Sequence, residues 1–170
     1  MLAGPSAAPL PKVIEPLKLV EQRAILQGEI AVAQLPRFSA MLLGDEGVAR
    51  VQMTFDKDEE GIPVIVGTVD ATVSVQCQRC LEPMALDLSA QLSLGIVLSD
   101  ERASHLPKYY DPLVLEDAEL SLWELAEDEL LLFLPLVASH GEDVCQVDAK
   151  YQQAEGDSSH PFAALQKLKN

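Results

Sequence analysis

An alternation of apolar and polar side chains constrains this sequence more than any other feature. It runs through three segments of the middle third, residues 48–55, 62–76 and 84–98. The first two are separated by an acidic stretch that ends in Gly61, which is typical of a hairpin turn. Because successive side chains of a strand point to opposite faces, each segment buries one face only. We therefore expect an antiparallel sheet in this part of the chain.

A pattern with helical spacing begins at Ser121. Ser121 and Glu124 form a capping box, and Pro135 prevents a helix from continuing past Leu134. Apolar residues of this segment recur three or four positions apart and predict a buried stripe: Trp123, Ala126, Leu130 and Phe133, widened by Leu122 and Leu125. The acidic residues are expected to face solvent instead: Glu124, Glu127 and Asp128.

These two patterns predict an α+β fold. An antiparallel β-sheet from the middle third packs against an acidic capped helix near 121–134, and the termini are loose. The expected organisation has four parts: a flexible leader (1–12), a single α+β domain (13–148), a linker (149–160) and a short terminal helix or docking tail (161–170). Within the domain, residues 24–32 predict a first strand and residues 35–43 a short helical turn.

The terminal segment carries Phe162, Leu165 and Leu168 at helical spacing. Such a segment can pack onto its own domain or dock on a partner, and the spacing fits both. Phe162 and Leu165 are the candidate contact residues.

Negative charge is concentrated in one region. The chain has 27 acidic and 12 basic residues and a net charge of −15, which disfavours a broad phosphate-binding face or an anionic membrane as partner. Eleven of the acids lie between Lys108 and Lys150, where there is no Lys or Arg. This stretch is either a solvated surface or a docking surface for a basic protein, with Glu124, Glu127 and Asp128 as candidate contacts. The alternative is direct RNA binding through a small basic patch that contains Arg79 and Arg50.

The three cysteines include a Cys-x-x-Cys motif, Cys77 and Cys80, at the end of a predicted strand. Three interpretations compete: a redox pair, buried unmetallated thiols, and half of a structural zinc site. A redox pair needs the start of a helix, where the dipole lowers a thiol pKa, but a strand pattern follows here. His140 and Cys145 could supply the other two zinc ligands if the fold brings the halves together.

Other signals are missing from the sequence. We see no signal peptide and no apolar stretch long enough to span a bilayer, so we expect a cytoplasmic protein with reduced thiols. There is no phosphate-binding loop, nucleophile elbow or His-Glu-x-x-His motif, and we expect no enzymatic activity. A thiol oxidoreductase at Cys77 and Cys80 is the enzymatic alternative.

Together these motifs resemble the YceD family, the bacterial large ribosomal RNA subunit accumulation proteins. The resemblance rests on the order of several short stretches over about residues 10–170: residues 75–83 with the Cys-x-x-Cys, 127–132, 134–137, His140, Cys145 and the terminal 161–165. It implies a non-enzymatic role in the synthesis, processing or stability of 23S rRNA in the large ribosomal subunit.

The resemblance also implies a partner and a metal. Family members are often encoded beside a small basic ribosomal protein of the large subunit, so a basic ribosomal protein or an assembly intermediate is the expected partner, and contact with rRNA is then indirect. Many members carry further cysteines where this chain has His140 and Cys145, which favours one structural zinc ion. His140 departs from an all-cysteine pattern.

Overall fold

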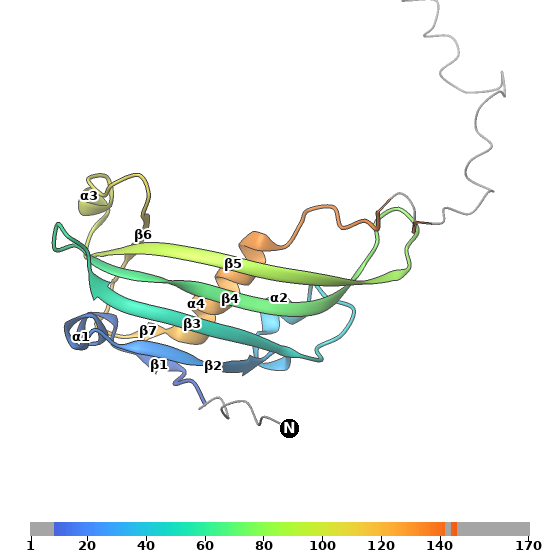
Figure 1. Cartoon of the computed structure of the whole chain (residues 1–170), viewed down its shortest axis with the longest axis horizontal. Helices are drawn as coiled ribbons and strands as arrows, with labels where there is room; N and C mark the ends of the chain where they lie inside the picture. The colour runs from blue at the N-terminus through green and yellow to red at the C-terminus, as the bar shows by residue number, and fades with distance from the viewer. Residues whose placement is uncertain (1–8, 142–143, 146–170) are drawn as a thin grey trace, which may run out of the picture.

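The computed structural model of the protein describes residues 9–141, 144 and 145. Its main sheet has five strands in the order β2-β3-β4-β5-β6 (Figure 1). The strands are β2 (Ile25–Ala31), β3 (Val48–Lys57), β4 (Pro63–Gln76), β5 (Pro83–Val97) and β6 (Asp111–Val114). Neighbours are antiparallel except β5 and β6, which are parallel. The expected α+β class with an antiparallel central sheet is confirmed, and the parallel edge strand β6 is an addition to it.

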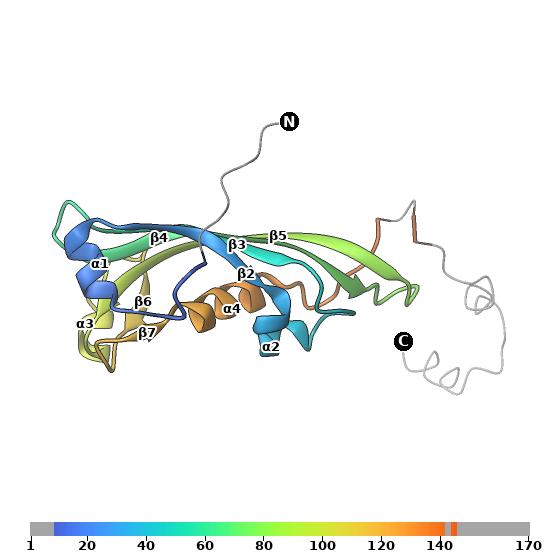
Figure 2. The same cartoon turned by 90° about the horizontal axis from the view of Figure 1, so that it is seen from below.

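The helices gather on one side of this sheet. They are α1 (Pro16–Gln22), the 3-10 helix η1 (Val32–Gln34), α2 (Pro36–Ser39), α3 (Asp100–Ala103) and α4 (Leu122–Phe133), and two short strands, β1 (Val13–Ile14) and β7 (Leu120–Ser121), pair with each other. Figure 2 shows α2 and α4 beneath the sheet, whose other face carries no helix in the part of the chain that the structure describes. None of the helices among the described residues is long and apolar enough to cross a membrane.

The alternation predicted for the middle third is observed. In β3 the side chains of Val51, Met53 and Phe55 are buried, whereas Gln52 and Thr54 between them are exposed. The β3–β4 turn forms as expected from its sequence, because the Asp58 carboxylate accepts hydrogen bonds from the backbone N–H groups of Glu60 and Ile62. Gly61 closes this turn with φ of 83°, a conformation that glycine adopts without strain.

Helix α4 begins and ends where the sequence predicts. The Ser121 hydroxyl accepts a hydrogen bond from the Glu124 N–H at 3.3 Å, and Leu134 is the C-terminal cap before Pro135. Leu122, Leu125, Ala126 and Leu130 are buried, as predicted. Phe133 departs from the predicted stripe and is 46% exposed, because it lies at the very end of the helix.

The prediction that Glu127 faces solvent is wrong. Its side chain is 3% exposed, and its carboxylate binds the first turn of α2. Oε1 accepts hydrogen bonds from the backbone N–H groups of Arg37 (2.7 Å) and Phe38 (3.0 Å), and Oε2 pairs with Arg37 Nε at 2.9 Å. Arg37 also pairs with Asp128 at 2.7 Å, and these contacts, the one with Glu127 first, raise the pKa of Arg37. Glu127 is therefore a structural residue that joins two distant segments.

The N-terminus of α2 explains why Glu127 is buried. The first N–H groups of a helix lack partners inside the helix and need an outside acceptor. Here Leu35 occupies the cap position, where it offers no side-chain acceptor, and Pro36 follows it. Glu127 replaces the missing cap from a separate helix. A carboxylate is favoured at this place because a helix N-terminus carries partial positive charge.

At the N-terminal end, the packed part of the chain begins before Val13. Leu10 is buried in the core, and the Lys12 carbonyl accepts a hydrogen bond from the Leu122 N–H at 2.9 Å. Leu10 and Lys12, which we expected to belong to the loose leader, are therefore held by the domain. The remainder of that leader, the predicted linker 149–160 and the terminal segment with Phe162 and Leu165 lie outside the described residues.

Replacing Glu127 by Ala should destabilise the protein strongly. Glu127→Ala leaves the backbone N–H groups of Arg37 and Phe38 without an acceptor, and we expect a loss of about 3–5 kcal/mol in the free energy of unfolding. Urea denaturation measures this difference. The matched control is Glu124→Ala on the exposed side of the same helix, with an expected loss below about 1 kcal/mol. Equal losses in the two variants would contradict the structural role of Glu127.

Candidate metal centre

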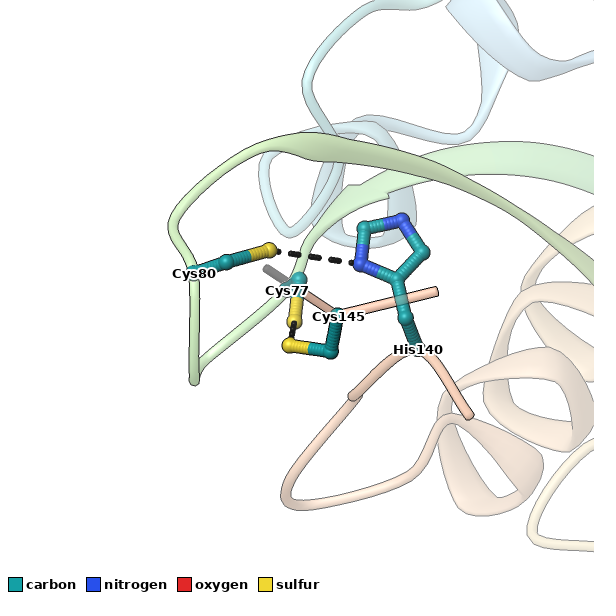
Figure 3. A group of neighbouring side chains, drawn as sticks. All are labelled: Cys77, Cys80, His140 and Cys145. Carbon is teal, nitrogen blue, oxygen red and sulfur yellow. Dashed lines mark hydrogen bonds between the residues drawn. The ribbon is translucent and has the colours of Figure 1, made fainter. Parts of the chain in front are cut away.

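The turn between β4 and β5 positions Cys77 and Cys80. The Cys77 N–H donates to the Glu82 carbonyl at 3.0 Å, and the Leu81 N–H donates back to the Cys77 carbonyl at 2.9 Å. Leu81 closes the turn with φ of 65°, a left-handed conformation that only a minority of non-glycine residues adopt. The turn brings both sulfur atoms toward the loop that follows α4 (Figure 3).

That loop supplies His140 and Cys145. After Pro135 has ended α4, the Ala138 carbonyl accepts a hydrogen bond from the Gln78 N–H at 2.8 Å, which fixes the loop to the turn. The N–H groups of Val144 and Cys145 both donate to the Gly141 carbonyl at 3.1 Å. The resulting bend carries Cys145 back toward Cys77. Neither the pairing of Gln78 with Ala138 nor the conformation of Leu81 had a signal in the sequence.

The four side chains have the spacing of a tetrahedral metal site. The sulfur atoms of Cys77 and Cys145 are 3.8 Å apart, and Cys80 Sγ lies 3.3 Å from His140 Nδ1. All four ligand atoms lie within 4.8 Å of one another. Ligands that bind zinc at about 2.0–2.3 Å in a tetrahedron are roughly 3.5–3.8 Å apart. The Cys77–Cys145 distance lies at the edge of this range, and the Cys80–His140 distance is slightly shorter.

The electrostatics of the thiols differ within this cluster. The backbone N–H of Cys80 lowers the pKa of Cys77 to about 5, against the opposing effect of burial, and the N–H groups of His140 and Arg79 add to the lowering. Burial, together with the neighbouring sulfur atoms of Cys80 and Cys77, raises the pKa of Cys145 to about 11. A divalent cation between the sulfurs would favour the thiolate form of all three, because a coordinating thiol loses its proton.

This arrangement can hold a metal ion. Three thiolates and one imidazole form a complete Cys₃His set, which is typical of structural zinc and leaves no position open for a substrate. The four residues predicted as ligands are therefore brought together by the fold, and metal binding itself stays a prediction. Cys77 and Cys80 lie in a hairpin turn and not at the start of a helix, so the lowered pKa of Cys77 comes from backbone N–H groups of this turn and the neighbouring loop and not from a helix dipole.

Acidic side chains gather on and beside α4. Glu124 and Asp128 are exposed and lie one helical turn apart. Glu129 is half-buried; burial raises its pKa, and the nearby carboxylates of Asp111 and Asp128 raise it further. We call the set of Asp111, Glu124, Asp128 and Glu129 the acidic face. Glu127, predicted to belong to it, does not contribute because it is buried.

The two arginines predicted to form a basic patch do not lie together. Arg50 projects from β3 and pairs with Glu29 at 3.6 Å, and its neighbour on β4 is Asp70. Arg79 is exposed in the β4–β5 turn. From Asp70 to the end of β4 at Gln76 the strand alone covers about 20 Å. Arg50 is thus surrounded by carboxylates, and Arg79 is isolated from it.

Comparison with known proteins assigns the chain to a family. The family model described as "Large ribosomal RNA subunit accumulation protein YceD" matches residues 65–169, which include all four candidate ligands. The Haemophilus influenzae protein of the same description is 32% identical over 167 residues, covering 94% of this chain and 96% of the relative. The chain belongs to the YceD family. The resemblance noted in the sequence is thereby confirmed.

No solved structure matches this YceD family member. The fold and the metal-ligand geometry described above therefore rest on this chain alone.

Purified full-length protein should contain one zinc ion per chain. Cys80→Ser and His140→Ala each remove one ligand and should abolish stoichiometric zinc in elemental analysis. The matched control is His105→Ala, because His105 is exposed and its ring contacts the Glu101 carbonyl away from the cluster. Chelation should lower the free energy of unfolding by about 3–4 kcal/mol relative to protein in zinc at 100–1,000 times Kd. Protein that takes up neither zinc nor cobalt and is insensitive to chelator would contradict the metal centre.

Proposed function

We propose that this chain is a non-enzymatic factor that supports the accumulation of 23S rRNA and the formation of the large ribosomal subunit. It does so by binding a basic ribosomal protein, or an assembly intermediate that contains one, through the acidic face. Family membership supports the ribosomal role. The observation that carries the choice of partner is the acidic face itself, displayed on a capped and packed helix.

The charge of this face favours a basic protein over RNA. RNA binding depends on Lys and Arg side chains that neutralise phosphates. Asp111, Glu124 and Asp128 repel phosphate and attract the Lys and Arg side chains of a ribosomal protein. Among the described residues, Arg37 pairs with Asp128 at 2.7 Å, and Lys12 lines the same hollow as Glu124 and Asp128. The effect on rRNA is then indirect, because assembled RNA is protected from degradation.

The metal has a structural part in this proposal. A zinc ion at Cys77, Cys80, His140 and Cys145 would tie the loop after α4 to the β4–β5 turn. The centre would keep the C-terminal end of α4 in place relative to the sheet and take no part in any reaction.

Neutralising the acidic face should abolish binding of the ribosomal partner. Tagged full-length protein is incubated with cell extract at low and at high salt, and the recovered proteins and RNAs are identified. We expect basic large-subunit proteins at low salt, fewer at high salt, and at least a tenfold lower recovery with the neutralised variant, because several close charge pairs are lost. The four substitutions remove charge but preserve shape: Asp111→Asn, Glu124→Gln, Asp128→Asn and Glu129→Gln.

The matched control removes the same number of charges from exposed acids elsewhere on the protein and should leave recovery unchanged. Its substitutions are Glu21→Gln, Asp45→Asn, Glu46→Gln and Asp87→Asn. Both variants must unfold at the temperature of the parent protein within a few degrees. Recovery of 23S rRNA fragments without any ribosomal protein would overturn the proposal in favour of direct RNA binding.

A further inference from the structure

An apolar groove lies beside the candidate metal centre. It occupies about 240 Å³ between the end of β4 and the segment after α4. Its lining includes Met41 and Leu43 from the segment after α2, Val75 from β4, and Leu134 and Leu136 from the segment after α4. A roughly 150 Å³ apolar cavity holds a benzene molecule, so this groove has room for an aromatic side chain.

The rim of the groove is apolar and uncovered in the part of the chain that the structure describes. Leu136 is 102% exposed, Met41 62% and Leu43 50%. Burial of such side chains is favourable, and contiguous exposed apolar surface usually marks a contact site. We therefore expect an apolar side chain or segment to occupy the groove.

The chain itself carries a segment of matching chemistry. On a helix, Phe162, Leu165 and Leu168 share one face, and Ala163 and Lys167 lie on the opposite one. Residues 161–170 include two lysines and no acidic side chain, in a protein whose net charge is −15. A segment of this kind is attracted to the rest of the molecule as well as suited to an apolar groove.

The stretch of chain that connects the groove region to this terminal segment is short. Cys145 lies in the cluster next to the groove, because Gln78 lines the groove and also binds the loop that leads to Cys145. The 16 residues 146–161 connect Cys145 to Phe162. An unstructured chain of that length spans roughly 20–24 Å on average and up to about 55 Å when extended, which is sufficient to return to the groove.

We propose that residues 161–169 dock in this groove of their own chain as an amphipathic helix, with Phe162 in the groove and Leu165 against its rim. A second copy of the chain is a poorer occupant, because a stable dimer needs about 800 Å² per partner and this groove is small. A segment of the same chain does not need so large an interface, because the linker holds it near the groove at a millimolar effective concentration. The proposal does not depend on the ribosomal partner or on the metal.

Site-specific photocrosslinking of the full-length protein tests this docking. A photoreactive amino acid replaces Leu136, and mass spectrometry locates the crosslinks after proteolysis. We expect crosslinks within the same chain to residues 161–169. The matched control places the same group at Val66, an equally apolar and 46% exposed position on the open face of the sheet, where we expect none to that segment.

Variants of the terminal segment complete the test. Phe162→Ser combined with Leu165→Ser should lower the crosslink yield at least tenfold, whereas Ala163→Ser on the opposite face should leave it unchanged. Crosslinks that join two chains would overturn the proposal in favour of a second copy. The absence of any crosslink to 161–169, or equal yields from position 66, would overturn it as well. Unchanged thermal unfolding of each variant confirms that the domain is intact.

Discussion

Burial of only one face of the sheet is the constraint on which the rest of this structure depends. Strands β3, β4 and β5 turn their apolar side chains to a single side, and that side needs a cover of other apolar side chains. Helix α4 covers β4 and β5 through Leu122, Leu125 and Leu130, and α1 packs against β3 and β4. The short helix α2 extends this cover with the buried Phe38. The opposite face carries no helix among the described residues (Figure 2), and most of its exposed side chains are polar, as Gln52 is.

Two of the helices that cover the sheet, α2 and α4, come from segments about 90 residues apart. A specific contact is therefore needed to hold them together. Glu127 makes this connection, because its carboxylate caps α2. Toward the far end, the β4–β5 hairpin extends past the end of α4 (Figure 1), and there the candidate metal centre meets the loop that follows the helix. The first contact is a buried carboxylate with its hydrogen-bond donors. The second is a set of candidate metal ligands. The first joins two helices of the layer to each other, and the second brings the loop after α4 to the β4–β5 turn of the sheet.

The sequence predicted the parts of this protein that depend on local pattern. Alternation placed the strands, and the Ser121 capping box and Pro135 placed α4, because these signals act within a few residues. The types of the four candidate ligands and their spacing were also enough to group Cys77 and Cys80 with His140 and Cys145. The burial of Glu127 could not be predicted in this way, since it depends on the uncapped start of α2 far away in the chain. The parallel pairing of β6 and the exposure of Phe133 likewise depend on where distant segments meet.

The groove and the candidate metal centre share their walls. Gln78 follows Cys77 directly and lines the groove, and Ala138, its hydrogen-bond partner, lies on the loop that carries His140. Any ligand that binds the groove better when these two walls are held together must raise the affinity of the cluster for metal by the same factor, because thermodynamic coupling is reciprocal. Metal retention is thus a reporter of what occupies the groove, and it can be read in the intact protein without labelling either site.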